Sequence, residues 1–285
     1  MSSRQPNESA RFDRQSDAER DRLEQENRAL RETMKQNDRD RVEYLQNVSH
    51  QLVSPLNAIK WHIENLTNNR VTVERGKKVL RSIYSQATLA IHLAKNFALM
   101  SNLEGDYALR ALREALEPVE VERLLVNLAD DYQPLAWDQD ITIGGERGVG
   151  VMPDVLAMKA LISQVFSNII ENAVKYSRRG TTIRIWTEFN SRLDEVSAFV
   201  ANTGIRLRPE DCNRIFERGF RSQEAQNAYP AGTGFGLYIA QKIVDLHEGC
   251  IDASTDKSGE TVFRVTLTVR GLEGKARQWD KRPSS

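Results

Sequence analysis

The chain has 285 residues, with 40 basic and 40 acidic side chains and therefore a formal net charge of zero. This balance argues against a nucleic-acid binder, because such domains usually carry an excess of basic residues. The length predicts about two domains, and a 40% share of hydrophobic residues is typical of a globular protein.

Cysteine content and hydropathy indicate the compartment in which the chain works. Cys212 and Cys250 form neither a disulfide framework nor a paired metal-binding spacing, which favours a reducing compartment. No stretch approaches the about 18 consecutive apolar residues of a membrane helix. The N-terminal residues also lack the apolar core of a secretory signal. We therefore expect a cytoplasmic protein, without membrane insertion, that receives its signal inside the cell.

The N-terminal segment up to Arg41 is polar and carries basic and acidic side chains in equal number. Residues 1–16 are expected to be disordered. Within 17–41, apolar and polar residues follow one another at steps of three and four, which indicates a weak coiled coil: Leu23, Asn27, Leu30 and Met34. A solvated single helix is the alternative, because Asn27 is polar and would lie in the seam.

Two amphipathic helices are expected within 42–105. Apolar residues repeat at helical spacing from Tyr44 onward: Leu45, Val48, Leu52, Leu56, Ile59, Ile63 and Leu66. A break at 67–70 separates them from a second such pattern, which runs from Leu80 to Ser101. The two helices form a hairpin. Because their apolar stripes are too long for one partner helix to cover, we expect a homodimer that closes a four-helix bundle.

After a linker at 106–117, residues 118–270 are long enough for an independent α+β domain. We expect helices at about 156–176 and 238–246, and strands at 182–187, 196–200, 249–255 and 261–269. This order predicts a mostly antiparallel sheet with helices on one face, an α/β two-layer sandwich. Residues 271–285 are expected to form a polar tail.

One histidine lies away from the apolar stripe of the first hairpin helix. At about 100° per residue, His50 points toward solvent, on the face that carries Ser54, Asn57 and Trp61. Pro55 lies inside the helix, where it removes a backbone hydrogen bond at a cost of ~3 kcal/mol. An exposed Trp61 suits the docking of a protein partner. The alternative is that His50 is an ordinary surface residue and Pro55 a tolerated kink.

A polar edge accompanies the helix expected to end at Tyr176. Asn168, Asn172 and Lys175 fall at i, i+4 and i+7 beside an apolar stripe. Amides can coordinate a metal ion and donate to phosphates, and a lysine supplies a point charge for them. On these residues alone, a solvated helix flank is the alternative.

A glycine-rich loop leads directly into the helix expected at 238–246, with the sequence Gly232-Thr233-Gly234-Phe235-Gly236-Leu237. Alternate glycines let backbone amides approach an anion, and the helix N-terminus adds partial positive charge. A loop that is merely flexible is the alternative for this triplet by itself. The preceding stretch, 206–231, is long enough to be a mobile lid.

These motifs resemble those of one family. The run Ser49-His50-Gln51-Leu52-Val53-Ser54-Pro55-Leu56 resembles the dimerisation and phosphoacceptor motif of sensor histidine kinases. The family's asparagine, adenine, phenylalanine and glycine motifs are similar to 168–176, 202–204, 215–220 and 232–237, in the same order. The resemblance covers about residues 44 to 256. It is to the kinases of two-component signalling, whose ATP-binding domain is shared with gyrase-type and MutL-type ATPases.

The resemblance implies a mechanism and a set of residues. ATP with Mg²⁺ would phosphorylate His50 within a homodimer, and the phosphoryl group would pass to an aspartate of a response-regulator receiver domain. A neutral imidazole is a competent nucleophile for this step. The input would come through the coiled coil or from an upstream sensor protein, because no sensor domain is evident. The implied sites are catalytic Gln51 and Ser54 beside His50, the magnesium ligand Asn172, and nucleotide contacts at Asn168, Asn172, Lys175, Tyr176, Asn202, Gly204, Phe216, Gly232, Thr233, Gly234, Gly236 and Leu237.

Some positions depart from the family pattern. Gln51 replaces the acidic residue that serves as general base, and an amide cannot accept a proton near neutral pH. Ser54 stands where threonine or asparagine commonly serves the reverse, phosphatase reaction. Asn202 replaces the aspartate that accepts the adenine amino group, and Arg206 replaces a glycine. These changes motivate a second hypothesis, a catalytically weak or inactive kinase-like dimeric adaptor that binds a signalling partner. A gyrase-type or chaperone-type ATPase would leave the hairpin and His50 unexplained.

Overall fold

The computed structural model describes residues 25, 27, 28, 31, 32, 49, 51–67, 72–102, 116–145, 152–229 and 232–269. The chain divides into two units, Met1–Ser49 and His50–Ser285. In the first unit the described residues are helical and exposed. Most of the expected coiled coil lies outside the described residues, as do the segment 1–16, most of the linker, His50 and the tail at 271–285. The domain boundaries drawn from the sequence stay predictions.

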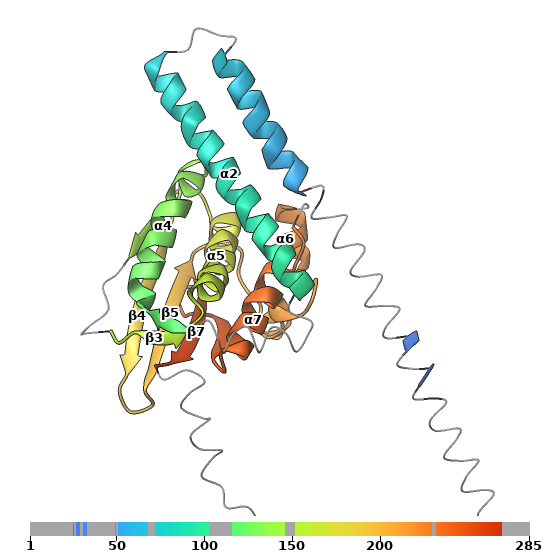
Figure 1. Ribbon diagram of the computed structural model, residues 1–285, viewed down its shortest axis with the longest axis vertical. Coiled ribbons are helices and arrows are strands. Elements are labelled where there is room, and N and C mark those ends of the chain that lie inside the picture. Colours follow the sequence, from blue (N-terminus) through green and yellow to red (C-terminus); the bar gives the residue numbers. More distant parts are fainter. Residues whose placement is uncertain are drawn as a thin grey trace, which may run out of the picture. The chain divides into compact units, whose positions relative to one another are not determined.

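A pair of antiparallel helices begins the second unit (Figure 1). The first covers residues 51–67, and the second, α2, covers Val73–Asn102. Helix α2 begins well before Leu80, where its apolar pattern starts. The reason is a cap: the Thr72 hydroxyl accepts a hydrogen bond from the backbone N–H of Arg75, 3.4 Å away. The first turns of α2 are therefore helical although their side chains bury little.

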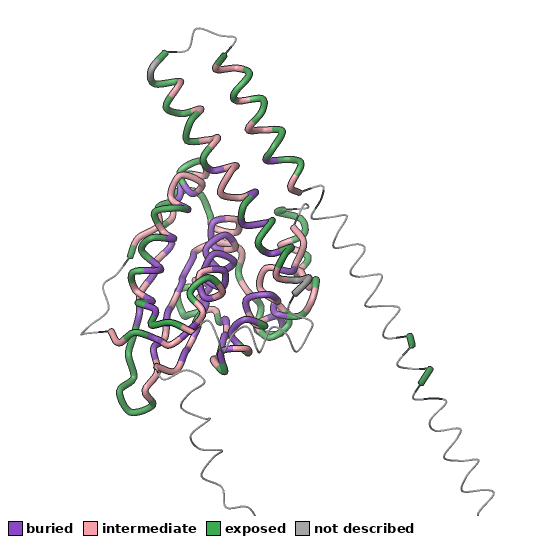
Figure 2. The backbone as a smooth tube through the Cα atoms, viewed as in Figure 1, coloured by how far each residue is buried: buried purple, intermediate pink, exposed green. Residues whose placement is uncertain are grey.

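Both hairpin helices carry many exposed residues (Figure 2), and several of them are large and apolar. About half or more of each is exposed: Val53, Leu56, Trp61 and Ile63 on the first helix, and Leu80, Tyr84 and Ile91 on α2. Between the helices, Ser82 Oγ and His62 Nε2 lie 2.8 Å apart. Within the described part of the chain, no helix has the length and hydropathy of a bilayer-spanning segment.

A five-stranded sheet forms one layer of the second unit, in the order β2-β4-β5-β7-β6. The strands are β2 (Thr142–Gly145), β4 (Thr182–Asn190), β5 (Glu195–Asn202), β6 (Cys250–Thr255) and β7 (Thr261–Thr268). Only the β2–β4 pairing is parallel, so the expected mostly antiparallel sheet is confirmed. Strand β2 was not expected, because Thr-Ile-Gly-Gly shows no apolar alternation.

A small second sheet corrects the expected start of one helix. Strand β1 (Glu117–Val119) pairs antiparallel with β3 (Val155–Ala157). A helix had been expected from about residue 156, but α5 covers Lys159–Tyr176. The apolar run that precedes it, Val155-Leu156-Ala157, fits a strand as well as a helix, because three residues are too few to show a period.

Three helices pack on one face of the large sheet: α4 (Val121–Trp137), α5 and α7 (Gly236–Leu246) (Figure 1). The strands turn alternate side chains toward them, such as Ile183 and Ile185 of β4, which are 0% and 4% exposed. On the opposite face, the rings of Trp186 and Phe199 stack with centroids 4.8 Å apart. The expected α+β two-layer sandwich is therefore confirmed. Helix α4 was not predicted, although its buried residues recur at helical spacing.

The stretch expected to form a lid contains short helices. Residues Pro209–Asp211 and Arg214–Phe216 form single 3₁₀ turns, η1 and η2, and Gln223–Ala228 form α6. The Ser222 side chain accepts a hydrogen bond from the N–H of Ala225 and caps α6. The described part of this stretch, 206–229, is called the lid segment below.

His247 joins the end of α7 to the start of α5. Its Nδ1 lies 2.7 Å from the carbonyl of Ile243, and its Nε2 lies 3.2 Å from the backbone N–H of Met158. Because the N–H of Met158 must donate, Nε2 accepts and the ring proton lies on Nδ1. Burial lowers the pKa of His247, and the hydrogen bond to Ile243 offsets part of that effect. The buried ring is therefore held in its neutral form.

A fall in pH is expected to destabilise the protein through His247. The unfolded chain takes up a proton near the ordinary pKa of about 6.5 while the folded chain resists it, so this contribution to stability is lost as the pH falls below that value. His247→Gln keeps a donor and an acceptor but cannot titrate. Its free energy of unfolding should therefore fall less than that of wild type between about pH 7.5 and about pH 5.5. Urea unfolding measures both, and parallel pH profiles would contradict the expectation.

Candidate functional site

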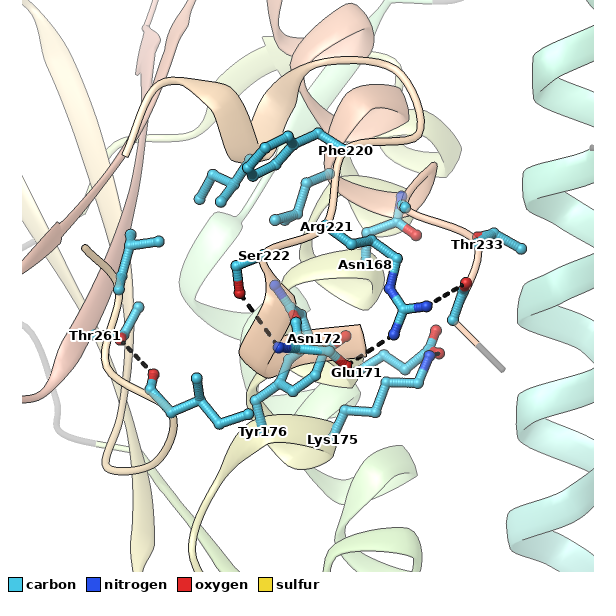
Figure 3. A pocket seen from close by; sticks show the side chains of 18 of the residues that line it. Asn168, Glu171, Asn172, Lys175, Tyr176, Phe220, Arg221, Ser222, Thr233 and Thr261 are labelled. Atoms are coloured by element: carbon cyan, nitrogen blue, oxygen red, sulfur yellow. Dashed lines mark hydrogen bonds and ion pairs between the residues drawn. The ribbon is translucent and has the colours of Figure 1, made fainter. Parts of the chain in front are cut away.

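One cavity in the second unit gathers most of the residues singled out from the sequence (Figure 3). Its walls come from α5, the end of β5, the lid segment, the start of α7, β7 and both hairpin helices. The sequence-predicted residues that line it are Gln51, Asn168, Asn172, Lys175, Tyr176, Asn202, Gly232, Thr233, Gly234, Gly236 and Leu237. Residues more than a hundred positions apart in the chain thus share one hollow.

Other predicted residues lie elsewhere. Ser54 is exposed on the 51–67 helix, and Phe216 is buried in η2 without lining the cavity. Gly204 lies at the crossing of β5 and the end of α5, where a Cβ would come within 1.8 Å of the Tyr176 carbonyl oxygen. Its role is to let the two backbones meet. His50 lies outside the described residues.

Helix α5 aims its polar edge into the cavity because its other sides are buried. Ile162, Val165, Phe166 and Ile169 are each 0% exposed. Those contacts fix the rotation of the helix about its axis, since turning it would expose its apolar stripe to water. Residues at i, i+4 and i+7 on the polar edge must then face one space, which Figure 3 shows for Asn168, Asn172 and Lys175.

A buried carboxylate, that of Glu171, positions the ammonium group of Lys175 in this cavity. Glu171 of α5 accepts a hydrogen bond from Lys175 Nζ at 2.8 Å and forms an ion pair with His92 Nδ1 of α2. Burial alone raises the pKa of Glu171, but Lys175 and His92 outweigh it and hold that pKa well below its usual range. Burial alone would lower the pKa of Lys175. The attraction of Glu171 outweighs this effect, so the pKa of Lys175 lies above its usual value. Lys175 therefore carries a positive charge into the cavity at neutral pH.

A chain of amides connects α2 to α5. Gln164 Nε2 donates to Asn96 Oδ1 at 2.9 Å, and Asn96 Nδ2 donates to Asn168 Oδ1 at 2.8 Å. Asn168 is 3% exposed, and its Nδ2 has no hydrogen-bond partner among the described residues. An unpaired buried N–H group costs about 1–3 kcal/mol. A ligand that supplies an acceptor there would recover that energy.

The glycine loop presents backbone rather than side chains to the cavity. Gly234 has φ +71°, and a Cβ on it would lie 2.7 Å from the carbonyl oxygen of Gly219. Only glycine adopts this conformation at this close approach. Helix α7 starts directly afterwards at Gly236, without a side-chain cap and without an acidic residue in its first turn. Its first N–H groups can therefore receive an anion.

Arg221 joins the lid segment to the glycine loop, a role that the sequence pattern did not reveal. Its guanidinium donates to the carbonyl of Gly232 at 2.9 Å and to that of Ala225 at 2.8 Å, and also to that of Tyr229 (Figure 3). Because one side chain donates hydrogen bonds to carbonyls of both segments, it keeps the two segments in contact. A lone arginine in a polar stretch gives no sequence signal of such a contact.

Much of the remaining cavity wall is apolar. Ile205, Leu207, Ile215, Phe220 and Phe263 line it together with two buried polar residues, Asn202 and Thr261. Asn202 and Thr261 are paired across β5 and β7. A flat apolar group with a few hydrogen-bonding edges, such as a nucleobase, fits such a surface. The cavity thus combines apolar walls with a cation and backbone N–H groups that can receive an anion.

The family comparison agrees with this geometry. Residues 158–271 match the model of the histidine kinase-, DNA gyrase B- and HSP90-like ATPase family. This segment is therefore similar to the ATPase domains of that family. It contains α5, the lid segment, the glycine loop and α7, which together form most of the cavity wall.

Similarity to known proteins extends beyond the ATPase domain. The chain is 28% identical to the heme sensor protein HssS of Staphylococcus saprophyticus over 241 residues, covering 84% of this chain and 49% of HssS. It is 26% identical to the histidine protein kinase SaeS of Staphylococcus epidermidis over 238 residues, covering 82% of this chain and 65% of SaeS. The resemblance to sensor histidine kinases is confirmed. The chain spans about half to two thirds of the length of these relatives.

Solved structures share the fold. Full-length ShkA, in complex with AMPPNP, has a TM-score of 0.53 at 23% identity, over 81% of this chain and 46% of ShkA. ThkA, in complex with the response regulator protein TrrA, has a TM-score of 0.51 at 20% identity, over 80% of this chain and 61% of that chain. At these identities the likeness concerns the fold alone, over about four fifths of this chain.

A magnesium ion would find amide oxygens and a ligand's own oxygens here. Among the described residues, no cluster of three or more His, Cys, Asp or Glu side chains could hold a metal. Mg²⁺ characteristically binds through few protein groups together with substrate phosphates and water. Asn172, which lines the cavity one turn from Asn168, is placed for such a role.

Gly204→Ala is expected to damage both the fold and the cavity. The added methyl group would collide with the Tyr176 carbonyl, a backbone atom that cannot rotate away. We expect a loss of about 2–3 kcal/mol in the free energy of unfolding and weaker nucleotide binding. Gly145→Ala is the matched control, because a Cβ there meets no atom within 4 Å. Urea unfolding and a nucleotide titration compare the two, and similar losses in both would contradict the expectation.

Proposed function

We propose that this protein is an ATP-dependent histidine autokinase that phosphorylates His50 and passes the phosphoryl group to a response regulator. The match to the ATPase family and the likeness to sensor kinases support this proposal. So does the cavity, which combines apolar walls for a base with Lys175, the Asn168 amide and the glycine loop for phosphates.

The observation that carries the proposal is the position of Gln51. This residue directly follows His50 in the sequence, and it lines the same cavity as Lys175 and Gly232. The acceptor motif and the phosphate-binding groups of one chain therefore border a single space. This supports transfer over a short distance, and it supports transfer within one protomer.

The proposed reaction needs little covalent chemistry from the protein. A ring nitrogen of His50 attacks the terminal phosphorus of ATP, a P–N bond forms, the P–O bond to ADP breaks, and the proton on the other ring nitrogen is released to water. Lys175 and the backbone N–H groups before α7 would hold the phosphates in place, and Asn168 would donate to them. Asn172 would hold Mg²⁺, which would supply charge neutralisation for the phosphates. Asn202, Thr261 and Tyr176 border the part of the cavity proposed for adenine.

The hairpin supports a homodimer and a protein partner. Leu56 and Ile63 on its first helix and Leu80 on α2 are 54%, 48% and 60% exposed within one chain. A second hairpin would bury these side chains in a four-helix bundle. Trp61, 60% exposed on the face of Ser54 and Asn57, suits the receiver domain of a response regulator. ThkA, which shares this fold, was crystallised with the response regulator TrrA.

Labelling with γ-³²P-ATP and Mg²⁺ tests the autokinase. Wild type should gain a phosphate that is labile in acid and stable in alkali, as expected of a phosphoramidate, and His50→Ala should abolish the label. His62→Ala on the same helix is the control, because His62 contacts Ser82 within the hairpin and should not accept phosphate. If wild type binds ATP but stays unlabelled, the chain is instead the kinase-like adaptor.

Gln51→Glu should accelerate labelling. A carboxylate beside His50 can accept the imidazole proton, and a general base contributes about 10²-fold or more. The initial rate at saturating ATP is the informative measurement, since the added charge also repels phosphates and raises KM. Gln139→Glu, in the turn after α4, makes the same change away from the cavity and should have no effect. An unchanged rate in Gln51→Glu would show that another group removes the proton.

A further inference from the structure

We propose that helix α2 of the hairpin completes the nucleotide site, because Asn96 holds the Asn168 amide with its N–H donors turned toward the phosphates. This inference rests on the proposed function, and it makes Asn96 a positioning residue that acts through Asn168. Asn96 is 8% exposed and lines the cavity together with Asn168.

The direction of this amide chain follows from the two partners of Asn96 on α5. Asn96 Oδ1 accepts from Gln164 Nε2 at 2.9 Å, so its Nδ2 is the atom that donates to Asn168. On α2 itself, Asn96 Nδ2 lies 3.4 Å from His92 Nε2, and His92 Nδ1 faces the carboxylate of Glu171.

Asn168 then has one orientation left. Asn96 Nδ2 donates to Asn168 Oδ1, while Asn96 Oδ1 is occupied by Gln164 Nε2. The oxygen of Asn168 faces α2, and its Nδ2, buried and without a partner among the described residues, is left for the ligand. Flipping Asn168 would set two NH₂ groups against each other. The hairpin thus selects a donor, the kind of group that a phosphate oxygen needs.

The same helix also supports the cation. His92 shares the carboxylate of Glu171 with Lys175, which lies 2.8 Å from the other carboxylate oxygen. With His92 in place, Glu171 binds Lys175 through one oxygen only, so the ammonium keeps donors for a phosphate. Both links run from one turn of α2, at His92 and Asn96, to one side of α5. A shift of α2 along its axis would disturb the two phosphate-binding groups together.

Two substitutions of Asn96 in the full-length chain test this inference. Asn96→Asp can only accept, so Asn168 would turn its NH₂ toward α2 and its oxygen toward the phosphates. We expect ATP affinity to fall by about tenfold or more, as for loss of a hydrogen bond to a charged group. Asn96→Leu removes the hydrogen bond without adding charge, and affinity should fall by about threefold to tenfold. Calorimetric titrations of each variant with ATP and with adenosine measure the two affinities.

The titration with adenosine distinguishes a positioning role of Asn96 from a role in folding, because adenosine lacks phosphates. Its affinity should stay at the wild-type value in both variants. Asn127→Asp, on the exposed face of α4, is the matched control for the added charge and should bind both ligands as wild type does. Thermal unfolding of each variant accompanies the titrations.

Distinct outcomes would overturn the proposal. Wild-type ATP affinity in Asn96→Leu would show that α2 does not position Asn168. Equal losses of adenosine and ATP would show that Asn96 supports the fold rather than the amide's direction. In either case labelling of His50 by wild type could still succeed, so the proposed function would survive. Absence of ATP binding by wild type would overturn both.

Discussion

The packing of α5 against the sheet and its neighbouring helices is the constraint on which the rest of the site depends. Phe166, Ile169 and Ile170 are fully buried, so the helix cannot rotate without exposing apolar surface. This fixes the direction of the opposite edge, where Asn168, Asn172 and Lys175 lie. The direction of this polar edge is therefore a consequence of core packing.

A buried carboxylate is costly unless cations and donors satisfy it, and Glu171 meets that condition with groups from two parts of the chain. Lys175 comes from its own helix, and His92 comes from the hairpin. The ion pair thus joins the helix that precedes the ATPase domain to the helix that lines its cavity. Polar contacts of this kind are directional, so they specify how α2 is seated more strongly than an apolar contact would.

The lid segment and the glycine loop contact each other through their backbones and through Arg221. Arg221 binds carbonyls of the lid segment and of Gly232, and Gly234 approaches Gly219 too closely for any side chain. Lid and glycine loop are therefore adjacent through main-chain atoms, beside the uncapped start of α7. An anion there would meet N–H groups held in place before it binds, which reduces the entropic cost of binding.

The sequence by itself determined the elements that a period or a motif can reveal. These include the hairpin, the strands β4 to β7, the polar edge of α5 and the glycine loop. It missed β2 and α4, because short or polar-diluted segments give weak periodic signals. Only the tertiary structure decided that Gln51 borders the same cavity as Lys175, that Gly204 serves a backbone crossing, and that His92 and Asn96 reach α5. Contacts between residues that lie far apart in the sequence leave no local pattern, since they depend on how separate elements pack.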